Sequence, residues 1–317
     1  MHCLSYVTQS KIGTMHKFQT NPISIDNNLA SIGKGLHKEQ RDFFIAEKAN
    51  LKNAFLDYDA HAVTNPVSLE NLLPIWIADP VDSAVQEKEK QDKRDRAYNL
   101  YGSSRPFVNR HWEALKKANG GKVLMCPICG LTECSEMDHY IPRSLYQEYS
   151  SHTSNLIPLC HECNHDKHEH WLSKGGVRYF FNAFYDRLPA TIIECIIMVN
   201  KGFPQVKVKQ HGRLDKKDYY DAIVLRTIKK LNLLEKFQVA ADMFMRSEIR
   251  RMKTDFSIWE KNGNSDRKAF WRSRIDAYNS YAKHTNDFNF IEVELYKSMA
   301  VSSELKNWVE HSAEFIA

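Results

Sequence analysis

Apolar side chains recur at intervals of three and four residues over much of the chain, which predicts a mostly helical protein. This spacing extends from Leu36 to Tyr58, from Arg105-Pro106 to Ala118, and from Tyr219 to Arg250, where one long helix or a pair of helices is expected. Proline marks several boundaries, because it lacks the backbone N–H that a helix interior needs. Asn65-Pro66 ends the first of these segments, and Asp79-Pro80 is predicted to open another helix.

Two segments in the second half of the chain add detail to this pattern. Phenylalanines at helical spacing, from Phe180 to Leu188, predict a short helix that ends at Leu188-Pro189. The β-branched run Thr191–Val199 is followed by Gln205–Gln210, in which valine alternates with lysine. With Asn200-Lys201-Gly202 between them, these two runs predict a β-hairpin that has one basic, solvent-facing side.

Composition places the chain among globular proteins. Of its 317 residues, 43% are hydrophobic and 26% are charged, and the net charge of +5 is compatible with a polyanionic partner without requiring one. No run approaches the ~20 apolar residues of a membrane span, and Met1–Gln19 lacks the apolar core of a secretory signal. We therefore expect a cytoplasmic protein with no membrane contact, whose cysteines stay reduced.

Four of the seven cysteines form two pairs with the same spacing, Cys126-Pro127-Ile128-Cys129 and Cys160-His161-Glu162-Cys163. Two thiolates on one tight turn can point at the same ion, so two such turns supply the four ligands of a tetrahedral zinc site. The alternatives are a redox pair and a chance arrangement of buried cysteines. A site with four sulfur ligands has no open position, so zinc there would hold shape and catalysis would need other residues.

Polar motifs stand between and after these pairs, in the order Asp138-His139-Tyr140-Ile141-Pro142, Asn155-Leu156, and Asn164-His165-Asp166-Lys167. This order closely resembles the HNH endonuclease family. The resemblance implies a central ββα-metal finger with a four-cysteine zinc site. Together with the apolar patterns on both sides, it predicts an α+β fold, mostly helical, with helical flanks and one extra β-hairpin. The expected domains are a helical region over residues 1–104, the nuclease domain over 105–172, and a helical domain over 173–317 with its hairpin near 191–210.

The chemistry of phosphodiester hydrolysis suits the same residues. A histidine such as His139 is a good general base, because its near-neutral pKa lets it accept a proton at working pH. Neighbouring residues of a strand point to opposite faces, so Asp138 can face a cation while His139 faces the attacking water. An oxygen-rich site made by Asp138 and Asn164 favours Mg²⁺ or Mn²⁺ as the catalytic ion.

The resemblance assigns further roles. Asn155 corresponds to the family's middle asparagine, which bonds to backbone and orients the base, and Lys167 and Arg143 are candidates for phosphate contacts. His168 is a candidate additional metal ligand. Asn164 departs from the commoner histidine at its position, and this leaves the identity of the metal open.

The function expected from this resemblance is a metal-dependent endonuclease that cuts DNA. An RNase of the same fold and a non-catalytic zinc module that binds nucleic acid or protein are the alternatives. The layout of the whole chain also loosely resembles stand-alone bacterial HNH proteins that serve as anti-phage effectors, such as the nuclease of Septu-type pairs. That likeness implies a regulatory ATPase or another defence subunit as a partner, and a symmetric double-strand cut would add a homo-oligomer.

Overall fold

The computed structural model describes residues 17–18, 23–77, 79–103, 105–120, 123–284 and 290–312. Nearly all of Met1–Gln19, on which the absence of a signal segment was argued, lies outside this part. The described residues form two compact units, the first drawn from the stretches 16–128 and 132–187, the second from 188–317 and Cys129–Leu131. The division into three domains expected from the sequence stays a prediction.

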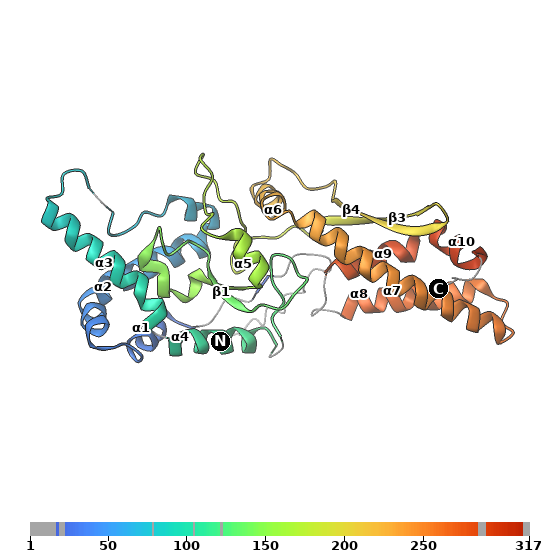
Figure 1. The fold of residues 1–317 in the computed structure, drawn as a ribbon, viewed down its shortest axis with the longest axis horizontal. Coiled ribbons are helices and arrows are strands. Elements are labelled where there is room, and N and C mark those ends of the chain that lie inside the picture. The colour runs from blue at the N-terminus through green and yellow to red at the C-terminus, as the bar shows by residue number, and fades with distance from the viewer. Residues whose placement is uncertain are drawn as a thin grey trace, which may run out of the picture. The chain divides into compact units, whose positions relative to one another are not determined.

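Helices dominate the first unit (Figure 1). They are α1 (Ile25–Gly33), α2 (Lys38–Thr64), α3 (Ala84–Ser103) and α4 (Arg105–Ala118), with short 3-10 segments at Pro66–Asn71, Gln147–Ser151 and Thr153–Asn155. The helix predicted from the spacing between Leu36 and Tyr58 is confirmed by α2, which buries Phe43, Leu51 and Phe55. It ends at Thr64, just before Pro66. The helix predicted to begin at Arg105-Pro106 is confirmed by α4.

The predicted start of α3 was wrong. Asp79 and Pro80 lie in a turn before the helix, where Asp79 Oδ1 accepts a hydrogen bond from the Val81 N–H at 3.1 Å. The cap is Ser83, whose Oγ accepts from the Gln86 N–H at 3.3 Å, while Gln86 Oε1 accepts from the Ser83 N–H at 2.9 Å. This reciprocal pair is a capping box, and it moves the start of the helix to Ala84.

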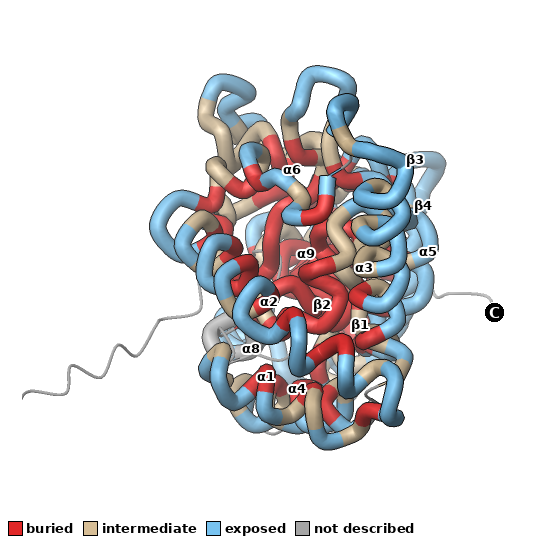
Figure 2. The backbone as a smooth tube through the Cα atoms, turned by 90° about the vertical axis from the view of Figure 1, so that its left-hand side faces the viewer, coloured by how far each residue is buried: buried red, intermediate tan, exposed pale blue. Residues whose placement is uncertain are grey.

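The predicted ββα finger is present. Strand β1 (Glu136–His139) pairs antiparallel with β2 (Leu156–Leu159), so that Asp138 lies opposite Ile157 and His139 opposite Leu156. Helix α5 (His161–Lys167) follows β2 directly and packs on β1 (Figure 1). All four residues of β2 are buried, as the red tube in Figure 2 shows. The fold class is therefore α+β and mostly helical, with small two-stranded sheets.

The phenylalanine-rich helix predicted near residues 180–188 was wrong. Residues 172–192 contain no helix, although Phe180, Phe181 and Phe184 are buried as core residues. Asn182 Oδ1 accepts a hydrogen bond from the Phe184 N–H at 2.9 Å, and Asp186 Oδ2 accepts from the Asn182 N–H at 2.7 Å. Such bonds from side chain to backbone compete with helical ones, so the segment forms turns instead.

A buried ion pair fixes this segment against the finger. Arg178 donates to both carboxylate oxygens of Asp186, at 3.0 and 3.2 Å, and neither side chain is exposed. Arg178 also donates to the Tyr140 hydroxyl at 2.7 Å, directly after β1. Separation of Arg178 from Asp186 would be costly, because it would leave a buried charge without its main partner. Residues 171–187 are therefore part of the structural surroundings of β1.

The second unit joins a hairpin to five helices within the described ranges: β3 (Ile193–Asn200), β4 (Phe203–Gln210), α6 (Tyr219–Lys230), α7 (Leu233–Lys261), α8 (Arg267–His284), α9 (Phe290–Val301) and α10 (Ser303–His311). The predicted hairpin is confirmed, because Val206 and Val208 are buried while Lys207 and Lys209 are exposed. Its turn uses the positive φ of Lys201 and Gly202, 51° and 81°. These angles suit a two-residue hairpin turn.

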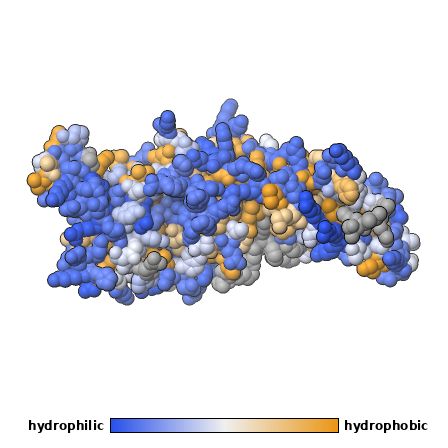
Figure 3. All heavy atoms as spheres, in the orientation of Figure 1, coloured by the Kyte–Doolittle hydropathy of each residue, from blue (hydrophilic) through white to orange (hydrophobic). Residues whose placement is uncertain are grey.

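The predicted helical segment from Tyr219 to Arg250 is a pair of helices. Asn232 takes a left-handed conformation, with φ 49°, and separates α6 from α7. Helix α7 packs along β4, and α9 and α10 pack against β3. No helix in the described ranges is both long and apolar enough to cross a membrane. The face drawn in Figure 3 is mostly hydrophilic, with apolar residues scattered over it.

Candidate active site and metal centre

The four cysteines of the two pairs come together. Cys126, Cys129, Cys160 and Cys163 are buried, and their sulfur atoms all lie within 4.8 Å of one another. A tetrahedral zinc ion bound at about 2.3 Å separates its sulfur ligands by about 3.8 Å, so this cluster fits a structural metal. Backbone N–H groups already face two of the sulfurs, from Leu131 to Cys129 and from Cys163 to Cys160, both at 3.4 Å.

Strand β1 presents two acidic side chains to α5 and one imidazole to its other side. Glu136 and Asp138 are two residues apart and therefore share a face. Both contact α5, Glu136 at Asn164 and Asp138 at Lys167. His139 lies on the opposite face, where its Nε2 is 2.9 Å from the Ser150 carbonyl oxygen. The structure thus separates the carboxylates from the imidazole, as the alternation of a strand requires.

Asp138 pairs with a buried lysine. Lys167 Nζ lies 2.9 Å from Asp138 Oδ2 and donates to the His139 carbonyl oxygen at 3.0 Å. Burial raises the pKa of Asp138, although the positive charge of Lys167 opposes this shift. We expected Lys167 to contact a substrate phosphate, but its side chain is only 2% exposed. In this arrangement its ammonium group pairs with Asp138, and its role as a phosphate contact stays a prediction.

Asn164 bonds to an acidic residue that the sequence reasoning missed. Its Nδ2 donates to Glu136 Oε2 at 2.5 Å, and the other oxygen of Glu136 lies 2.6 Å from His161 Nδ1. These two hydrogen bonds lower the pKa of Glu136. A carboxylate only accepts, so the NH₂ end of the amide must face Glu136. The Asn164 side-chain oxygen has no hydrogen-bond partner among the described residues, and it is available to a cation.

The donors on this face suit a hard divalent ion. Asp138, Asn164 and Glu136 offer carboxylate and amide oxygens, which are the ligands that Mg²⁺ and Mn²⁺ prefer. Asp138 and Asn164 bond to different partners here, Lys167 and Glu136, rather than to each other. Glu136 could have been found in the sequence, because it precedes Asp138 by two residues on the same strand face.

The imidazole of His139 is held in one tautomer. The Ser150 carbonyl only accepts, so Nε2 carries the proton and Nδ1 keeps its lone pair. Burial is the main cause that lowers the pKa of His139 to about 3, and the charges of Arg143 and Lys167 act in the same direction. The ring also meets the Tyr101 ring edge-on, with centroids 4.6 Å apart. His139 is therefore neutral near pH 7, and its pKa lies below the near-neutral value expected from the sequence.

Arg143 lies close to this imidazole. Its guanidinium carbon is 4.2 Å from the centre of the Tyr98 ring and 5.3 Å from that of Tyr101. Two tyrosines of α3 thus hold the guanidinium in place by cation–π contact. The positive charge of Arg143 reaches His139, whose pKa it helps to lower.

Asn155 ties the loop after β1 to the start of β2. Its side chain is fully buried, and Oδ1 accepts from the Ile141 N–H at 2.8 Å. Its Nδ2 donates to the carbonyl oxygens of Ile141 and Tyr149, at 3.0 and 3.2 Å. Tyr149 directly precedes Ser150, whose carbonyl meets His139. His168 is exposed at the end of α5 with φ 46°, and its role as a ligand stays a prediction.

Comparison with known proteins assigns the finger to a family. The HNH endonuclease family matches residues 126–170. The chain carries an HNH endonuclease domain. "Protein ea31" of Escherichia phage lambda is 31% identical over 67 residues, which are 21% of this chain and 21% of that protein. No solved structure matches the chain. An HNH domain suggests nuclease activity and implies a nucleic-acid substrate, and nucleases of this family use metal.

Proposed function

We propose that the protein is a metal-dependent endonuclease that hydrolyses phosphodiester bonds, with DNA as its substrate. The observation that carries this proposal is the arrangement on β1. A neutral imidazole with a fixed tautomer stands on one face of the strand, and oxygen donors stand on the other. A module that only bound zinc would not need an imidazole and oxygen donors on opposite faces of β1.

The roles of the side chains follow from their surroundings. Nδ1 of His139 takes a proton from the attacking water, while the Ser150 carbonyl keeps Nε2 protonated. Asn155 holds the backbone that carries this carbonyl. Arg143, fixed on its tyrosines, offers a positive charge to the scissile phosphate. Lys167 keeps the Asp138 side chain in place.

Two metals belong to the proposal. The four cysteines would hold zinc as a structural ion. Asp138 and Asn164 would hold Mg²⁺ or Mn²⁺, with His168 as a further candidate ligand. Such an ion, when bound, supplies charge stabilisation to the phosphate and to the leaving oxygen.

The decisive experiment compares substrates. Purified protein is incubated with supercoiled plasmid, single-stranded DNA and total RNA, each with Mg²⁺, with Mn²⁺ and with EDTA. We expect cleavage of DNA that requires the divalent ion. Cleavage of RNA alone would show the RNase alternative to be right. Binding without cleavage of any of the three would show that the protein is a non-catalytic module.

We also propose, from the loose resemblance in layout, that the nuclease is the cytoplasmic effector of an anti-phage system and works with a regulatory ATPase or another subunit. Cells that express the chain with its neighbouring genes should lower phage plating efficiency, and an Asp138→Ala variant should not. Equal plating on both strains would contradict this role while leaving the nuclease proposal intact. A double-strand cut in the plasmid assay would favour a homo-oligomer, because two strands need two active sites.

A further inference from the structure

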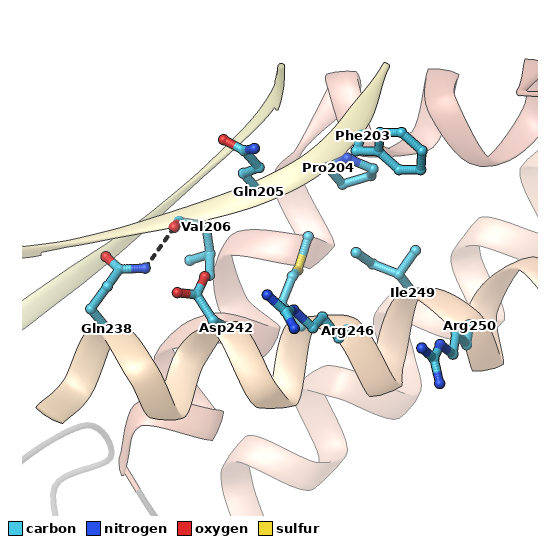
Figure 4. Close-up of a pocket in the computed structure, with 10 residues that line it drawn as sticks. Phe203, Pro204, Gln205, Val206, Gln238, Asp242, Arg246, Ile249 and Arg250 are labelled. Carbon is cyan, nitrogen blue, oxygen red and sulfur yellow. Dashed lines mark hydrogen bonds between the residues drawn. The ribbon is translucent and has the colours of Figure 1, made fainter. Parts of the chain in front are cut away.

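The second unit contains a groove between β4 and the middle of α7, with a volume of about 640 Å³ (Figure 4). One side is formed by the start of β4, from Phe203 to Val206, and the other by successive turns of α7 that carry Asp242, Arg246 and Arg250. Met245 and Ile249 are among the lining residues and are buried, so the groove combines an apolar base with charged walls.

The groove offers little to an added β-strand. Gln238 covers the edge of β4, because its Nε2 donates to the Val206 carbonyl and its Oε1 accepts from the Val208 N–H, at 2.9 and 2.8 Å. The next position towards the hairpin turn is Pro204, which has no N–H to donate. A peptide that paired with this edge would find few ladder bonds, so recognition must come from the side chains.

Two of the side chains in the groove are arginines without an ion-pair partner among the described residues. Arg246 and Arg250 are exposed and make no hydrogen bond or ion pair with the described residues. Nearby basic residues differ, since Arg251 pairs with Glu248, Arg274 with Asp255, and Lys253 donates to the carbonyl oxygens of Val309 and Ser312. Arg246 and Arg250 are one helical turn apart, about 6 Å along the axis. That spacing is comparable with the separation of successive phosphates along one nucleic-acid strand.

The groove also contains an exposed aromatic ring. Phe203 lines the groove beside Pro204 and is 57% exposed. Exposed aromatic rings beside positively charged grooves are the elements with which proteins bind single strands, by stacking bases and neutralising phosphates. Lys207 and Lys209, which share the exposed face of β4 with Phe203, add positive charge.

We propose that this groove binds a single-stranded nucleic acid, with Arg246 and Arg250 on its phosphates and a base stacked on Phe203. This inference rests on the proposed function, since it names a place outside the HNH domain where the nucleic-acid substrate is bound. Asp242 is the opposing charge in the groove. Its carboxylate repels phosphates, so the strand lies towards Arg246 and Arg250.

The test measures the affinity of the full chain for a short fluorescein-labelled oligothymidylate by anisotropy, in a His139→Ala background that prevents cutting. Arg246→Glu with Arg250→Glu should weaken binding at least tenfold. Loss of two phosphate contacts should also reduce the slope of log affinity against log salt by about 1.4. Phe203→Ala should weaken binding about tenfold, and Asp242→Asn should strengthen it.

The matched control is Lys268→Glu with Arg272→Glu, which makes the same charge change at exposed positions of α8. We expect it to change affinity less than twofold. Equal weakening by the control and the groove variant would overturn the proposal, because net charge alone would then explain binding. Unchanged binding of the strand, with loss of binding to a polyglutamate peptide, would show instead a groove for an acidic protein.

The two proposals fail separately. If the wild-type protein cuts DNA while the groove variants bind as tightly as the control, the groove inference is wrong and the nuclease stands. If binding depends on the groove but the wild-type protein cuts nothing, the nuclease proposal is wrong and the groove inference stands. Should the double charge reversal unfold the protein, Phe203→Ala and Asp242→Asn, which predict opposite shifts in affinity, decide the matter.

Discussion

Replacement of His139 by alanine should reduce plasmid cleavage by about 10²- to 10⁴-fold, the usual contribution of a positioned general base. The expected loss follows from the tautomer: no other side chain on this face of β1 presents a ring nitrogen with a free lone pair beside Arg143. The measurement is the rate of plasmid conversion in Mg²⁺ and in Mn²⁺. Zinc content and circular dichroism of the variant should match those of the wild-type protein.

The control for this variant is His165→Ala, which removes an exposed imidazole from α5 and should leave the rate unchanged. Cleavage at the wild-type rate by a folded, zinc-loaded His139→Ala protein would show that another group is the base. Equal loss in both variants would show that the rate reports on the stability of the finger rather than on His139.

Replacement of Cys126 or Cys163 by serine should release the zinc and unfold the finger. Zinc supplies on the order of 10 kcal/mol of apparent free energy to modules of this kind. The elements of the finger are short, two four-residue strands and the seven-residue α5, so the metal is the main tie between its two ends. We expect the zinc content to fall from one ion per chain to none, with loss of cleavage. Prolonged chelation of the wild-type protein should have the same effect.

Cys195→Ser is the matched change, because Cys195 is also buried but lies in β3 of the second unit. It should keep its zinc and its activity. Equimolar zinc retained by Cys126→Ser would contradict the assignment of the four cysteines as one site, and the role of zinc as a scaffold would be wrong with it.

Local signals decided which elements could be predicted from the sequence. The alternation of valine and lysine in β4 fixes which side of the strand is buried, and a positive φ at Lys201 and Gly202 suits the turn. Each pair of cysteines could be recognised because the C-x-x-C spacing brings two sulfurs together on one turn, while the meeting of the two pairs depends on the fold between them. These features depend on neighbours in the chain, so the sequence carries them directly.

The predictions that were wrong concern segments whose conformation depends on residues distant in the sequence or on side-chain bonds that compete with helical ones. Phe180, Phe181 and Phe184 have helical spacing, yet Asn182 and Asp186 bond to backbone, and Arg178 holds Asp186 in the interior. In the site, the buried pairing of Lys167 with Asp138 is a second feature that residues distant in the sequence determine. The charge of Lys167 and its position in the motif suggested a phosphate contact, whereas burial beside Asp138 could be seen only in three dimensions.

The network of Arg178, Asp186 and Tyr140 has a consequence for any attempt to transplant the nuclease module. The family match stops at residue 170, but both charges of the buried pair lie beyond it, while the phenol that receives Arg178 lies within it. A fragment truncated at residue 170 would leave the Tyr140 hydroxyl without the Arg178 donor. It would also lack Phe180 and Phe181, which line the same pocket as Asp138 and Lys167. The smallest fragment expected to fold by itself therefore extends at least to Asp186.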